Sequence, residues 1–99
     1  MIRHIIFWTL SDAGRARDQR ALLAELRASL AGMDGKIDGL LRAEIGPNTA
    51  GGCDYVFYAE LRDEAALAAY QTHPLHMAHK ARFADVFSER RVGDYKTGA

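Results

Sequence analysis

The stretch Ala69-Tyr70-Gln71-Thr72-His73-Pro74-Leu75-His76 lies between two apolar, alanine-containing segments of the chain. Proline suits the first turn of a helix and disfavours helical geometry in the residue before it, here His73. The stretch therefore predicts that one helix ends before Pro74 and that another begins there. Because the chain changes direction at this point, we expect Tyr70 and His76 to project into the same space between the helices and a sheet.

The residues on either side of this break extend both helices. Asp63 is a suitable N-cap for the first helix, which continues through Leu67 to Tyr70. The second helix is expected to carry on one side His76, His79, Phe83, Val86 and Phe87. A short last strand is expected at residues 91–96.

The first half of the chain predicts three strands and one long helix. Residues 2–10 are β-branched and aromatic and are apolar on both faces, as expected of a buried strand. Ser11 or Asp12 is a candidate cap for a helix of about five turns. Its apolar stripe consists of Leu22, Leu26, Leu30 and Met33. Two more strands are expected at residues 40–45 and 53–61, separated by a glycine-rich polar loop.

The resulting order, β-α-β-β-α-β, predicts an α+β fold of the ferredoxin-like type with a four-stranded antiparallel sheet. Residues 1–99 are too few for a second domain, so one domain is expected. Right-handed crossovers place the first and third strands in the centre of the sheet. Those two strands are also the most apolar, whereas the second and fourth carry charged residues typical of edge strands.

The sheet face opposite the helices is predicted to be apolar as well. It would present Ile5, Phe7, Val56 and Tyr58. An open antiparallel sheet normally leaves its second face polar, so something is expected to cover this one. A second copy of the chain, packed sheet to sheet, is the simplest cover, and we expect a homodimer.

Composition and charge exclude several classes of protein. The formal net charge is zero, from 13 basic and 13 acidic residues, and no basic block extends beyond a pair. This disfavours nucleic-acid binding and polybasic attachment to membranes. No segment approaches the roughly 20 apolar residues of a membrane span. Cys53 is the single cysteine, so no disulfide within the chain is possible. We therefore expect a soluble cytoplasmic protein.

The residues with the clearest chemistry are Tyr70 and His76. A neutral imidazole can transfer protons near neutral pH, and a phenol can donate a hydrogen bond to a developing oxyanion. A structural interpretation competes with this one. In it His73 bonds free backbone amides at the start of the second helix, and His76 is an ordinary core residue.

A metal site is not predicted, although His76 and His79 have the spacing of an i, i+3 pair of ligands. Three histidines at steps of three residues drift around the helix, and His73 precedes the proline. No carboxylate or cysteine pattern completes a site. No cofactor is expected either.

With the stretch at residues 69–76, the chain resembles the stress-responsive A/B barrel (Dabb) family of the dimeric α/β barrel superfamily. Two further stretches carry the resemblance, residues 1–6 (Met-Ile-Arg-His-Ile-Ile) and residues 92–95 (Val-Gly-Asp-Tyr). The resemblance covers nearly the whole chain. It implies a ferredoxin-like fold and a dimeric barrel formed by two sheets.

The resemblance also implies candidate site residues. A plant polyketide cyclase of this family closes a linear chain by aldol condensation without a cofactor, using a Tyr-x-x-His-Pro-x-His arrangement. Its tyrosine and histidine match Tyr70 and His76, and its N-terminal pocket histidine matches His4. Where the cyclase has another pocket histidine on the third strand, this chain has Tyr55. The candidate ligand contacts are thus His4, Trp8, Tyr55, Phe57, His73 and Phe83.

Three functions are compatible with the sequence. The first is a binding protein for a small apolar or aromatic, polyketide-like molecule held between sheet and helices. The second is a cofactor-independent enzyme, in which Tyr70 and His76 carry out an aldol-type cyclisation. The third is a structural stress protein that forms oligomers.

Overall fold

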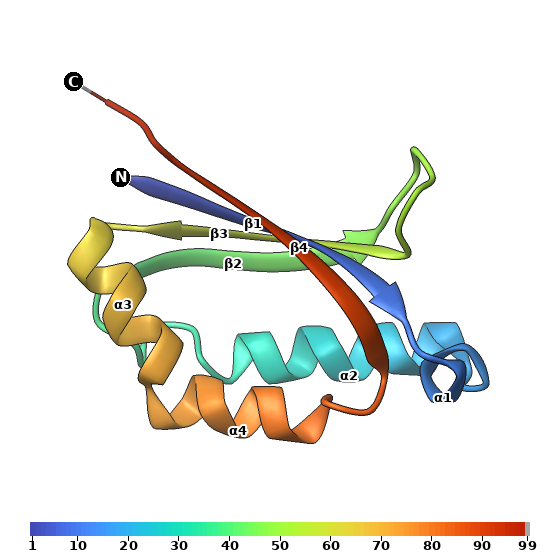
Figure 1. The fold of residues 1–99 in the computed structure, drawn as a ribbon. Coiled ribbons are helices and arrows are strands. Elements are labelled where there is room, and N and C mark those ends of the chain that lie inside the picture. The colour runs from blue at the N-terminus through green and yellow to red at the C-terminus, as the bar shows by residue number, and fades with distance from the viewer. Residues whose placement is uncertain (99) are drawn as a thin grey trace.

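The computed structural model describes residues 1–98 and shows a four-stranded antiparallel sheet with all helices on one of its faces (Figure 1). The strand order is β2-β3-β1-β4, so the predicted ferredoxin-like fold with the first and third strands in the centre is confirmed. The elements are β1 Ile2–Leu10, α1 Asp12–Arg15, α2 Gln19–Ala31, β2 Leu40–Pro47, β3 Tyr55–Leu61, α3 Glu64–Thr72, α4 Pro74–Arg82 and β4 Phe87–Lys96.

The core lies between the central strands and the helices. Alternate residues of β3 are buried, and β1 pairs with it so that Ile6 lies opposite Phe57 on the helix-facing side. Leu22 and Leu26 of the predicted apolar stripe are almost fully buried. The pleat of the strands and the 3.6-residue period of α2 therefore direct their apolar residues to the same layer.

The prediction of one long first helix is wrong, because two shorter helices, α1 and α2, occupy that part of the chain. Ser11 caps α1, and its hydroxyl accepts a hydrogen bond from the Gly14 amide. Asp18 then caps α2, accepting from the Ala21 amide at 3.0 Å. The side chain of Gln19 donates to the Gly14 carbonyl at 2.9 Å, which stabilises the turn between the helices. A second N-cap residue thus interrupts the helix after one turn.

The end of the second helical region also differs from the expectation. Asp63 caps α3 and Pro74 begins α4, as predicted. However, α4 ends at Arg82, and Phe83 is its C-cap. Phe87, expected on the helix, instead begins β4, which is therefore longer than the strand predicted at residues 91–96.

The face of the sheet opposite the helices is open in the single chain. Ile5, Val56 and Tyr58 are partly exposed there, and Phe7 is 44% exposed. Figure 1 shows that the loop between β2 and β3 rises on this open side, while the helices lie on the other. The apolar outer face predicted from strand alternation is therefore present.

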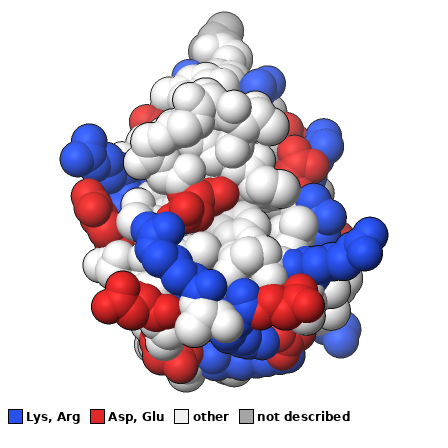
Figure 2. Space-filling view, turned by 90° about the vertical axis from the view of Figure 1, so that its right-hand side faces the viewer, with Lys and Arg blue, Asp and Glu red and all other residues white. Residues whose placement is uncertain are grey.

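The charged surface has no dominant sign. Figure 2 shows acidic and basic side chains interspersed over the end of the molecule near α1. In residues 1–98, no helix has the length and apolar character needed to cross a membrane.

Candidate functional site

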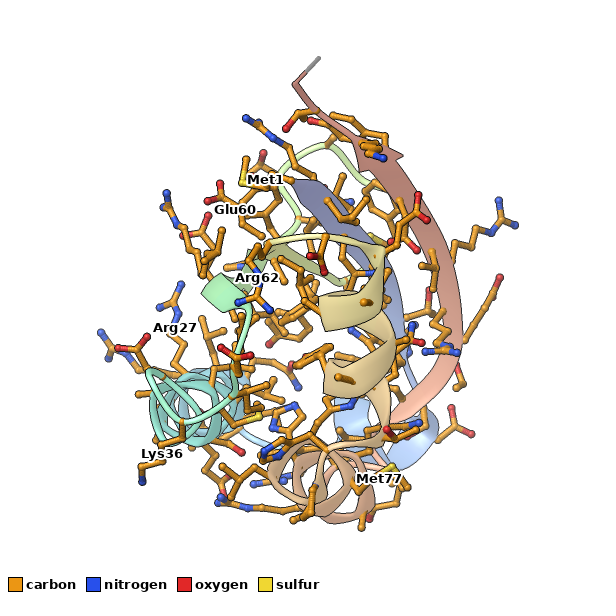
Figure 3. The ribbon with its side chains drawn as sticks, turned by 90° about the vertical axis from the view of Figure 1, so that its left-hand side faces the viewer. Met1, Arg27, Lys36, Glu60, Arg62 and Met77 are labelled. Atoms are coloured by element: carbon orange, nitrogen blue, oxygen red, sulfur yellow. The ribbon has the colours of Figure 1, made fainter. Side chains whose placement is uncertain are left out.

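A cavity of about 440 Å³ lies between the sheet and the helices. This volume falls within the range of pockets that hold small molecules. Figure 3 shows side chains from the sheet and from the helices α3 and α4 projecting into the layer that contains it. Its apolar lining includes Ile6, Trp8, Leu26, Leu30, Ile45 and Phe57.

Tyr70 and His76 both line this cavity, and their rings lie against each other. The ring centroids are 4.1 Å apart with an interplanar angle of 31°. Tyr70 is near the end of α3 and His76 is in the first turn of α4, and the bend at Pro74 brings the two side chains together. The structure therefore joins the two residues as the sequence suggested.

The two rings have complementary hydrogen-bonding states. Burial raises the pKa of Tyr70 to about 12, so its hydroxyl stays protonated and can donate. No hydrogen-bond partner of this hydroxyl occurs among residues 1–98. Burial lowers the pKa of His76, and the charges of Lys80 and Arg90 add to the effect, so the imidazole is neutral near pH 7.

The position of the proton on His76 follows from its neighbour. Its Nδ1 lies 3.3 Å from the backbone carbonyl oxygen of Gln71, which can only accept a hydrogen bond. Nδ1 therefore carries the proton, and Nε2 keeps its lone pair. His76 therefore has a proton acceptor, Nε2, and it packs on the ring of Tyr70, which carries a hydroxyl donor.

Two more histidines line the cavity. His4 is buried on β1, and its Nδ1 contacts the carboxylate of Asp94 on β4. Its ring lies edge-on to Tyr70, with centroids 6.4 Å apart. His79 on α4 bonds the Ser29 hydroxyl on α2 at 2.7 Å through Nδ1. Tyr70 and three histidines thus line the cavity, His4 from the sheet and the others from α3 and α4.

The aromatic wall agrees in part with the sequence expectation. Trp8, Phe57 and Phe83 line the cavity, as anticipated. Phe87 does so too, stacking on Trp8 with ring centroids 4.5 Å apart. Phe87 was expected on a helix, but at the start of β4 it lies beside β1.

Tyr55 and His73, expected as ligand contacts, lie outside this cavity. Tyr55 is at the far end of β3, where its hydroxyl donates to the side-chain oxygen of Gln19 at 2.9 Å. His73 caps α4, and its Nδ1 accepts from the Leu75 amide at 3.1 Å. The structural interpretation considered for His73 is therefore the one observed.

Sequence reasoning missed several polar residues of the cavity. Gln71, Lys80 and Arg90 line it together with His79. The position of Lys80, four residues after His76, was a usable signal, because such residues share a helical face. The position of Arg90 at the cavity depends on the pairing of β4 with β1, and local sequence patterns do not reveal that pairing. Figure 3 shows Met77 on the outer side of α4, away from the sheet.

The histidines at residues 73, 76 and 79 do not converge. Within residues 1–98, no three His, Cys, Asp or Glu side chains come close enough together to hold a metal ion. His73 bonds the backbone, His79 bonds Ser29, and His76 packs on Tyr70. Each histidine therefore has a separate environment.

The partly buried histidines of α4 predict a loss of stability in acid. Burial, with smaller contributions from His76 and Arg82, lowers the pKa of His79 to about 4, and the pKa of His76 is lowered too. A histidine in the unfolded chain titrates near 6.5. From about pH 6.5 down to about 4, the unfolded state therefore binds more protons, and the free energy of unfolding should fall by up to about 2–3 kcal/mol.

Urea unfolding of the unmodified protein and of His79→Gln at pH 7.5 and 4.5 measures this contribution. Glutamine keeps a polar partner for Ser29 but does not titrate. The decrease between the two pH values should be smaller by about 1–2 kcal/mol in the variant. Equal decreases in both proteins would show that His79 does not cause the acid sensitivity.

The sequence was compared with models of known protein families. The model of the Stress responsive A/B Barrel Domain matches residues 2–97 of the chain. No curated protein matches the sequence.

Solved structures share the fold along nearly the full length. A dimeric protein with a ferredoxin-like fold from Bacteroides fragilis is 22% identical, with a TM-score of 0.82, and 97% of this chain and 95% of that chain are covered. A dimeric ferredoxin-like protein from Thermobifida fusca is 25% identical, with a TM-score of 0.80 and coverages of 97% and 90%. A Dabb family protein from Mesorhizobium loti is 24% identical, with a TM-score of 0.75 and coverages of 99% and 97%.

Proposed function

The chain belongs to the Stress responsive A/B Barrel Domain family, and we propose that it binds a small apolar or aromatic molecule in the cavity between sheet and helices. Polyketide-like compounds, which combine an aromatic or aliphatic body with oxygen atoms, are the class that fits this chemistry. The observation that carries the proposal is a cavity of about 440 Å³ in which aromatic and aliphatic side chains are combined with polar groups from the sheet and the helices.

The polar groups favour a ligand with oxygen atoms. The Tyr70 hydroxyl is a donor without a partner among residues 1–98, and Nε2 of His76 is an acceptor. His4 lies edge-on to both Tyr70 and Phe57, so its ring adjoins the apolar wall and the polar group. A carbonyl or hydroxyl group of a ligand would satisfy these side chains while its carbon skeleton contacts Trp8 and Phe83.

Trp8 provides a direct test, because it is the single tryptophan of the chain and lines the cavity. Titration with 2-naphthol or 1,3-dihydroxynaphthalene should change its fluorescence in a saturable way. Ala84→Phe narrows the cavity and should weaken binding by about tenfold, equivalent to about 1.4 kcal/mol. Ala81→Phe is the matched control, since Ala81 is an exposed residue outside the cavity lining.

The proposal predicts that only the variant within the cavity affects binding. Calorimetry with both probes checks the fluorescence result independently. An absence of binding by both methods, or an equal effect of Ala84→Phe and Ala81→Phe, would contradict binding in this cavity.

The arrangement of Tyr70 and His76 supports a second candidate, a cofactor-independent cyclase of the aldol type. Nε2 of neutral His76 would remove a proton from a carbon between two carbonyl groups, and Tyr70 would donate to the enolate oxygen. The carbanion would then form a bond to another carbonyl carbon of the same molecule. The alkoxide that results would take the proton back from His76.

We also propose that the protein is a homodimer formed through the outer face of the sheet. The apolar residues Ile5, Phe7 and Val56 lie on that face and are partly exposed in the single chain. The similar proteins from Bacteroides fragilis and Thermobifida fusca are dimeric. Sheet-to-sheet packing would remove this apolar surface from water and leave the cavity on the other side of the sheet.

A further inference from the structure

The charged side chains around the cavity all have the same sign. Lys80 and Arg90 line it, and no aspartate or glutamate does so among residues 1–98. Neither cation has a carboxylate within ion-pair distance in this part of the chain. The carboxylate of Asp94, which is outside the cavity lining, contacts His4. Within residues 1–98, the two positive charges in the cavity lining therefore have no carboxylate paired directly with them.

Ion pairs between arginines and carboxylates are common elsewhere on the surface. Six other arginines each lie within 4.0 Å of a carboxylate oxygen, namely Arg15, Arg17, Arg42, Arg62, Arg82 and Arg91. Most of the arginines of the chain thus have an acidic neighbour, although exposed pairs of this kind stabilise a protein little. Several other cations of residues 1–98, Lys36 and Arg20 among them, also have no ion pair, but Lys80 and Arg90 are the two that line the cavity.

The two cations come from opposite sides of the cavity. Lys80 is on α4, four residues after His76 and therefore on the same helical face. Arg90 is on β4, where it lies opposite Trp8 of β1 and so on the helix-facing side of the sheet. Both residues are exposed, which places their charges toward solvent rather than in the core. They also contribute to lowering the pKa of His76, after the larger effect of burial.

We propose that the molecule bound in this cavity carries a carboxylate, which pairs with Lys80 and Arg90 while its apolar body lies against Trp8 and Phe83. This inference rests on the proposed binding function and specifies the class of ligand, an aromatic or aliphatic carboxylic acid. Charge-assisted hydrogen bonds from a lysine and an arginine are stronger than neutral ones, so they would select an acid over an uncharged analogue.

The position of Lys80 also relates the acid to the polar rings. Lys80 follows His76 by four residues, which span about 6 Å along an α-helix. A ligand carboxylate paired with Lys80 would therefore lie about 6 Å from His76 in the direction of the α4 axis. A ligand held in this way would place an atom about 6 Å from its acid group beside Tyr70 and His76. The cations thus orient the ligand, and the rings contact its oxygen atoms.

Pairs of matched probes test the inference. Calorimetry at low ionic strength should show that 2-naphthoate binds about 10- to 100-fold more tightly than 2-naphthamide, which has a similar shape without the charge. Decanoate should likewise bind more tightly than decanamide. Raising the salt concentration should reduce the preference, because exposed charges are screened.

Variants identify the residues responsible. Lys80→Gln and Arg90→Gln should each weaken naphthoate binding by about three- to tenfold and leave naphthamide binding unchanged. The double variant should bind both probes equally. Lys36→Gln and Arg20→Gln remove the same charge from exposed positions outside the cavity lining and should have little effect.

The outcomes separate this inference from the function on which it rests. Equal binding of acid and amide would overturn the inference and leave binding of an apolar ligand intact. A preference for the acid that survives the double variant would also overturn it, since the charge would then be recognised elsewhere. An absence of binding by every probe, including 2-naphthol, would overturn the inference and the proposed function together.

Discussion

Phe7→Glu is expected to convert the protein from a dimer to a monomer. Phe7 lies on β1 in the centre of the outer sheet face, where it is 44% exposed in the single chain. In a sheet-to-sheet dimer its ring would be buried against the second copy, and a carboxylate there would be buried without a partner. The cost of such a charge, about 3–5 kcal/mol, corresponds to an increase of roughly 100- to 1000-fold or more in the dissociation constant.

Sedimentation equilibrium over a range of protein concentrations measures the effect. Met77→Glu is the matched control, because Met77 is 49% exposed in the single chain but lies on the outer side of α4 (Figure 3). Both substitutions replace an exposed apolar side chain by the same charge, and only the one on the sheet should change the mass. A folded monomer of the unmodified protein, or an equal response of the two variants, would contradict the proposed interface.

The elements whose ends are marked by local chemistry could be predicted from the sequence. Asp63 and Pro74 set the starts of α3 and α4, since one caps a helix and the other suits its first turn. The alternation along β1 and β3 identified the two central strands and the apolar outer face. These features depend on neighbouring residues, so they do not require knowledge of the tertiary structure.

The wrong predictions arose where a local sequence pattern was compatible with two different secondary structures. Asp18 is as good a cap as Ser11, and it divides the predicted long helix into α1 and α2. The apolar residues Phe83 and Phe87 have a spacing that fits a helix, but α4 ends at Arg82 and Phe87 belongs to β4. Periodicity alone does not locate the end of a helix that lacks a glycine or proline after it.

The candidate site was predictable only in part for a related reason. The break at Pro74 explains why Tyr70 and His76 meet, and it could be read directly from the chain. Tyr55 was expected as a ligand contact because it stands where the similar plant cyclase has a pocket histidine, yet it lies at the far end of β3 and bonds Gln19 instead. The face of a strand follows from alternation, whereas the position along it relative to the helices follows from the tertiary packing.

His76→Ala should lower the turnover of any aldol-type cyclisation that the protein catalyses by about 10²–10⁴-fold, the usual scale for a positioned acid or base. Burial lowers the pKa of His76, and its Nδ1 proton faces the Gln71 carbonyl, so Nε2 is free to accept a proton from carbon. Poly-β-keto thioesters are suitable substrates, and the cyclised product can be followed by chromatography. His73→Ala is a control, because His73 caps α4 outside the cavity.

Tyr70→Phe tests the other half of the pair. It removes the hydroxyl and keeps the ring that packs on His76 at a centroid distance of 4.1 Å. Loss of one oxyanion donor should lower turnover by about 10²–10³-fold, with a smaller effect on ligand binding. The rate of the unmodified protein should fall as the pH drops below the lowered pKa of His76, because the protonated ring cannot act as a base.

The two substitutions should also be strongly non-additive. If His76 removes the proton and Tyr70 stabilises the enolate that the removal creates, then the hydroxyl has little to stabilise once the base is gone. The double variant should therefore retain nearly the turnover of His76→Ala alone. Losses that multiply would mean that the two residues contribute independently to the rate, and an activity indifferent to His76→Ala would exclude His76 as the base. Retained binding of 2-naphthol by all variants would then leave the protein as a binder whose Tyr70 and His76 contact the ligand without chemistry.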